Sequence, residues 1–87
     1  MKSFNQLSNY SLFRIICALK GNKVKTISII GERNFENLSA FSAIVSKPDG
    51  VLNAEAKTHL QVLVQKTVEG WGTSRLQRTI DKICITD

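Results

Sequence analysis

The run VKTISII at residues 24–30, which Gly31 closes, is the segment on which the predicted fold class depends. Most of its residues are β-branched, and such side chains favour extended strands. Ile29 and Ile30 are consecutive, which indicates burial on both faces of a sheet. We therefore predict a central β-strand over Val24–Ile30.

The residues before this run predict an amphipathic helix that begins near Asn9. Its apolar residues recur at the i, i+3, i+4 and i+7 spacing of one helical face: Leu12, Ile15, Ile16 and Leu19. Gly21 and Asn22 follow, and residues of these types end helices or form turns. We expect this helix to lead directly into the strand.

The residues after the strand, 34–46, fit two structures. Their apolar residues keep helical spacing, yet those after position 40 also alternate as in a strand: Phe35, Leu38, Phe41, Ala43 and Val45. We predict helix for the first half, with Asn34 as its cap, and leave residues 40–46 open between helix and strand.

A turn at Pro48, Asp49 and Gly50 precedes a long predicted helix. Asn53 suits its N-cap and Gly70 its end, and Glu55 places a carboxylate in the first turn, where it complements the helix dipole. Its apolar face comprises Ala56, Leu60, Leu63, Val64 and Val68.

The last segment, residues 73–83, predicts a helix with two chemically distinct faces. The apolar face comprises Leu76, Ile80 and Ile83. The basic face comprises Arg75, Arg78 and Lys82. One face can pack on a core while the other presents cations to a partner. Residues 83–86 fit a short edge strand equally well.

The predicted order of elements is α-β-(α or β)-α-α, an α+β fold in which helices pack on a short sheet. Neither a repeat nor a linker divides the sequence, so we treat residues 1–87 as a single domain. A domain of this size buries only about 60% of its unfolded surface, which leaves little room for an enclosed active site.

Charge and composition limit the kinds of partner and location that we expect for this chain. Twelve Lys and Arg residues against seven Asp and Glu give a formal charge of +5, which favours nucleic acid or an acidic protein surface as partner. The apolar run at residues 12–19 is interrupted by Arg14 and is too short to span a membrane. We predict a cytoplasmic protein without a signal peptide, in which Cys17 and Cys84 stay reduced.

Catalytic chemistry finds little support in the sequence. His59 is the only histidine, and no acid or nucleophile is placed near it by spacing. Two cysteines and one histidine, widely spread, do not form a metal-ligand pattern. We therefore predict no enzyme, no metal and no cofactor.

The predicted binding surface combines the basic face of the last helix with two further features. Trp71, between Gly70 and Gly72, suits an anchor for a partner, although a tryptophan at such a turn more often plugs the edge of the core. Lys20, Lys23 and Lys25 form a second basic cluster, of which Lys23 and Lys25 are candidate contacts, and adjacency of the two clusters would favour nucleic acid. The alternative interpretation of the basic face is a solvated surface partly balanced by Asp81.

The glycine turn before residues 73–75 also resembles the start of a helix-turn-helix recognition helix. Two positions depart from that motif: Arg78 stands where an apolar residue is expected, and Val68 where a small one is expected.

These observations predict a small non-enzymatic regulatory protein that binds a macromolecule through its basic C-terminal helix. Nucleic acid is the first candidate partner. The alternative is an adaptor or inhibitor that binds an acidic protein surface, anchored by Trp71. A homodimer is a further alternative, because Val62 widens the apolar face of the long helix. Small basic chains of this kind are typical of accessory and mobile-element proteins.

Overall fold

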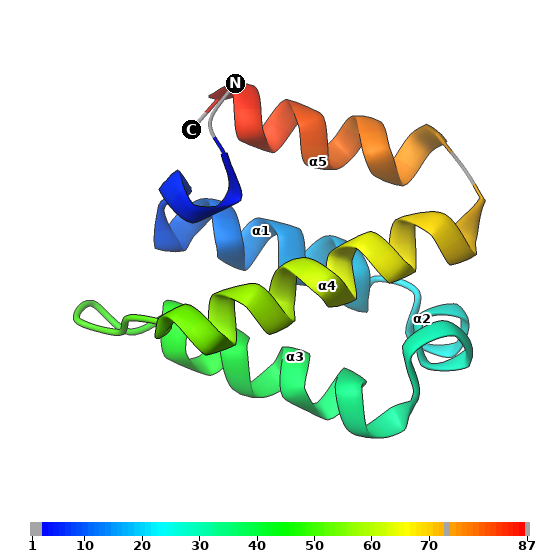
Figure 1. Ribbon diagram of the computed structural model, residues 1–87, viewed down its shortest axis with the longest axis horizontal. Coiled ribbons are helices and arrows are strands. Elements are labelled where there is room, and N and C mark those ends of the chain that lie inside the picture. Colours follow the sequence, from blue (N-terminus) through cyan, green and yellow to red (C-terminus); the bar gives the residue numbers. More distant parts are fainter. Residues whose placement is uncertain (1–2, 73, 87) are drawn as a thin grey trace.

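The computed structural model describes residues 3–72 and 74–86, and the part of the chain that it describes is helical without a strand (Figure 1). Among these residues a short 3-10 helix, η1 (Phe4–Gln6), comes first. Five α-helices follow: α1 (Asn9–Lys20), α2 (Lys23–Ile30), α3 (Glu32–Val45), α4 (Ala54–Trp71) and α5 (Ser74–Thr86). The predicted α+β class, with its short sheet, is therefore wrong.

The predicted strand at residues 24–30 is the helix α2. Asn22 caps this helix by accepting a hydrogen bond from the backbone N–H of Lys25 at 3.3 Å, and Gly31 ends it with a φ of 89°. A lone strand would have left its backbone N–H and C=O groups without a partner strand, whereas a helix pairs them internally. Val24 is 81% exposed, which also contradicts burial on both faces of a sheet.

Burial of the side chains of α2 follows a helical repeat. Thr26 and Ile30, one turn apart, are its buried residues. The Thr26 hydroxyl donates to the backbone carbonyl of Leu19 at 2.6 Å and so joins α2 to the end of α1. Tertiary packing of this kind overrides the modest strand preference of β-branched residues.

The two segments left open between helix and strand are both helical. α3 continues unbroken through residues 40–45, and α5 continues through residues 83–86. α3 begins at Glu32 rather than near Asn34, whose side chain instead donates to the carbonyl of Ile30 at 2.8 Å. α4 begins after Asn53 as predicted but ends at Trp71, with Gly72 rather than Gly70 in the left-handed capping conformation.

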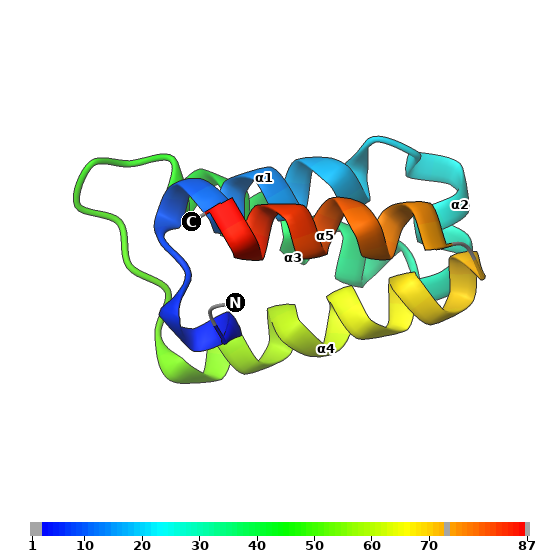
Figure 2. The same cartoon turned by 90° about the horizontal axis from the view of Figure 1, so that it is seen from above.

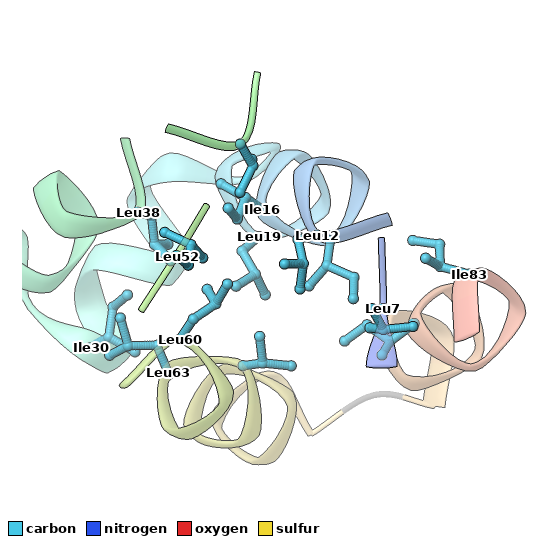
Figure 3. Close-up of a cluster of buried hydrophobic side chains, with 14 of the residues drawn as sticks. Leu7, Leu12, Ile16, Leu19, Ile30, Leu38, Leu52, Leu60, Leu63 and Ile83 are labelled. Atoms are coloured by element: carbon cyan, nitrogen blue, oxygen red, sulfur yellow. The ribbon is translucent and has the colours of Figure 1, made fainter. Parts of the chain in front are cut away.

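The helix α1 packs against all four other α-helices, α2, α3, α4 and α5 (Figures 1 and 2). Four of its apolar side chains are fully buried: Leu12, Ile15, Ile16 and Leu19. Side chains from the other helices converge on them, among them Leu38, Leu60, Leu63 and Ile83 (Figure 3). The predicted helical spacing of α1 is thus confirmed.

α2 and α4 approach each other closely where α4 ends. A Cβ atom on Gly70 would lie only 2.6 Å from Cγ2 of Ile29, so glycine permits this approach. At the opposite end of α4, the predicted turn at residues 48–50 is present, and the backbone N–H of Gly50 donates to the carbonyl of Lys47 at 3.2 Å. The Asn9 side chain donates to the carbonyl of Gly50 and ties this loop to α1.

Candidate nucleic-acid interface

The two faces predicted for the last helix are present in α5. Leu76, Ile80 and Ile83 are buried against the core, at most 7% exposed. All three cations of the basic face are exposed to solvent: Arg75, Arg78 and Lys82. Helical periodicity alone was sufficient to predict this division.

The Asp81 side chain is hydrogen-bonded to a neighbour on its own helix. Its Oδ1 accepts a hydrogen bond from Nε2 of Gln77 at 2.8 Å, one turn earlier on α5. Within residues 3–72 and 74–86 no ion pair engages Arg75, Arg78 or Lys82. The positive charge of the three side chains is therefore directed at solvent.

An open groove of about 400 Å³ lies on the surface where α5 packs against α1. It is lined by Tyr10, Phe13, Arg14, Cys17, Ala18, Thr79 and Ile83. None of the described residues that line it is acidic, and Arg14 adds a cation from the α1 side. Arg75 and Lys82 lie one turn before and one turn after Thr79 on α5, so their positions flank the same groove.

Exposed Tyr10 and half-buried Arg14 form a pair on α1. Tyr10 is 70% exposed, and the Arg14 guanidinium carbon lies 5.7 Å from the centre of its ring, within the range of a cation–π interaction. Sequence reasoning missed this pair. Its signal was an aromatic residue and an arginine at i and i+4 on the polar side of an otherwise apolar helix.

Other hollows on the surface differ from this groove in charge. The hollow between α2 and α3 contains Glu32 and Glu36 beside Lys23, and the one between α4 and α5 contains Asp81. The hollow between α1 and the end of α3 is lined by Tyr10, Phe13, Val45 and Ser46 and is uncharged. Of these hollows, the α1–α5 groove is the one that combines aromatic side chains with a cation and without a carboxylate.

The lysines of the second predicted basic cluster do not line the α1–α5 groove. Lys23 faces the hollow shared with α3, whereas the Lys25 ammonium lies 5.3 Å from the centre of the Trp71 ring. Trp71 is half-buried and packs against the core, and its indole nitrogen is buried without a hydrogen-bond partner among the described atoms. Lys25 and Trp71 therefore contact each other at the α2–α4 corner rather than lining the α1–α5 groove.

The helix-turn-helix resemblance is not matched by the arrangement of α4 and α5. The two helices of that motif cross steeply, whereas α5 runs back alongside α4 and α1 (Figures 1 and 2). The departures at Val68 and Arg78 are thus accompanied by a different geometry: Val68 packs against the core, and Arg78 is exposed.

The remaining candidate residues lie apart from the groove. His59 is half-buried and makes an edge-to-face contact with Phe41, with ring centres 5.9 Å apart. Val62 is 44% exposed, and the residues one turn away on its side of α4 include Thr58, Gln65 and Lys66, so it is a single apolar residue among polar ones. Cys17 and Cys84 are not joined in a disulfide.

Among the residues that the structure describes, no three His, Cys, Asp or Glu side chains gather as a metal site would require. No helix formed by these residues has the length and apolar character needed to cross a membrane. Comparison of the chain with protein-family models, with curated proteins and with solved structures gave no match.

Proposed function

We propose that this chain is a small non-enzymatic protein that binds nucleic acid through the basic face of α5 and acts as a regulator. The observation that carries the proposal is the exposure of Arg75, Arg78 and Lys82 on one side of a helix whose other side is anchored in the core. Cations held at helical spacing can follow a phosphate backbone and release its counterions. We infer a cytoplasmic location, where thiols remain reduced.

Salt dependence tests the proposal directly. Three phosphate contacts predict that affinity for duplex DNA falls about 40-fold between about 50 and about 200 mM salt. Fluorescence anisotropy of labelled DNA and RNA measures this slope. Absence of binding at the lower salt concentration would refute the proposal.

A matched pair of variants locates the contact. Arg78→Glu should weaken binding to all sequences and reduce the salt slope by about one. Lys66→Glu makes the same change in charge on α4, on the side where His59 and Gly70 contact α3 and α2, away from α5. Equal effects of the two variants would mean that only the net charge matters and that α5 is not the contact surface.

The alternative partner is an acidic protein surface anchored by Trp71. Because Trp71 is half-buried beneath Lys25, Trp71→Ala also removes core contacts, so loss of binding by this variant must be compared with its stability. Binding of an acidic protein by a chain that binds no nucleic acid at low salt, and its loss in a folded Trp71→Ala variant, would favour this alternative.

A further inference from the structure

The α1–α5 groove contains an aromatic ring that duplex binding would not use. Tyr10 is 70% exposed at the start of α1, with the Arg14 guanidinium over its ring and Phe13 beside it in the groove. A buried ring would be explained by packing, and a lone exposed ring would need no explanation. An exposed ring paired with arginine inside an acid-free groove combines the two parts of a single-strand binding site: a stacking surface and cations along the backbone.

We propose that the α1–α5 groove binds single-stranded nucleic acid, with a base stacked on Tyr10 and the adjoining phosphates held by Arg14, Arg75 and Lys82. This inference rests on the function proposed above and names its ligand class and its stacking residue. Bases in a duplex are already stacked on each other, so Tyr10 can be reached only by an unpaired base. The phosphate contacts alone would serve either form.

The placement of the cations supports a strand that lies along the groove. Arg14 is on the α1 side, and Arg75 and Lys82 flank Thr79 on the α5 side. Positive charge is thus available on both helices, and the aromatic side chains come from α1. Carboxylates lie in other hollows of the surface, where Glu32, Glu36 and Asp81 would repel phosphate.

The test compares Tyr10→Leu with Tyr10→Trp in anisotropy measurements on labelled oligothymidylate and on a duplex of equal length. Removal of one stacking contact should weaken single-strand binding about 5- to 140-fold, while Tyr10→Trp should preserve it. Duplex binding should be unchanged in both variants. Because the side chain of Tyr10 is mostly exposed, both variants should unfold at the wild-type temperature, which circular dichroism verifies.

Alkylation of Cys17 provides a second measurement at the same place. Cys17 is exposed and lines the groove, whereas Cys84 lines the hollow between α4 and α5. Oligothymidylate in the groove should slow modification of Cys17 relative to Cys84, as quantified by mass spectrometry.

The outcomes distinguish the two proposals. Two results together would establish the site. Single-strand binding should be lost in Tyr10→Leu but retained in Tyr10→Trp, and oligothymidylate should protect Cys17 from alkylation. Two other results would refute single-strand binding in the groove while the basic-face proposal stands. In one, binding depends on salt but is unchanged in Tyr10→Leu; in the other, bound oligothymidylate does not protect Cys17. Absence of binding to either form of nucleic acid would refute both.

Discussion

Gly70→Ala tests whether α2 packs as a helix on the last turns of α4. In a helix with open surroundings, this exchange stabilises by up to about 1 kcal/mol. Here the new Cβ would lie 2.6 Å from Cγ2 of Ile29 and 2.8 Å from its Cγ1 and Cδ1. Ile29 is β-branched and sits in a helix, where one χ1 rotamer is strongly preferred, so its side chain cannot easily turn away.

Crowding of this kind costs about 1–3 kcal/mol, which exceeds the gain in helix propensity. We therefore expect Gly70→Ala to lower the free energy of unfolding by about 1 kcal/mol, equivalent to about 4–8 °C in Tm for a domain of this size. Ile29→Ala removes all three crowding atoms. In that background, Gly70→Ala should instead raise the free energy of unfolding, by up to about 1 kcal/mol.

Urea unfolding of the four proteins in this double-mutant cycle, followed by far-ultraviolet circular dichroism, measures the change of sign. The coupling free energy between the two positions should be about 1–3 kcal/mol. If Gly70→Ala stabilises both backgrounds equally, Ile29 does not lie against Gly70, and the docking of α2 on α4 is refuted.

Two further predictions concern the ends of helices. Thr26→Val should destabilise the protein by about 1–3 kcal/mol, because the carbonyl of Leu19, in the last turn of α1, loses its buried hydroxyl donor. Thr26→Ser keeps the hydroxyl and should retain most of the stability. Equal stability of the Val and Ser variants in thermal unfolding would contradict this. Asn53→Ala should lower the free energy of unfolding by about 1 kcal/mol, because the side chain accepts from the backbone N–H of Ala56 at 2.7 Å; a neutral result would show that this cap is dispensable.

Helices with a clear apolar face were predictable from the sequence. The burial of Leu12, Leu60 and Ile80 follows from residues repeated at helical spacing, and the cap at Asn53 follows from its residue type. These features depend on neighbours within one or two turns, so a single sequence contains the necessary information.

α2 was mispredicted because it is eight residues long and rich in β-branched residues. Its local composition favours a strand, whereas its burial at Thr26 and Ile30 follows a helical spacing of four. Asn22 before the segment and Gly31 after it are a cap and a stop of the kind that bounds helices, and they were the available signal.

The basic side of the candidate site was also predictable, but its aromatic side was not. Arg75, Arg78 and Lys82 are near each other in sequence, so their shared face follows from periodicity. The groove pairs Arg14 with Thr79, which lie 65 positions apart (79 − 14). Periodicity carries no information about which helices become neighbours, so that pairing required the structure.

The α2–α4 corner also determines which event the tryptophan fluorescence of this molecule reports. The chain has one tryptophan and one tyrosine, and the structure places them in different environments. Trp71 lies beneath Lys25 at the corner, so its fluorescence should follow the docking of α2 and hence the integrity of the fold. Tyr10 lies in the α1–α5 groove, so its fluorescence emission should fall when a base stacks on its ring. Unfolding and ligand binding therefore have separate native chromophores, and each can be monitored without attaching a dye to the protein.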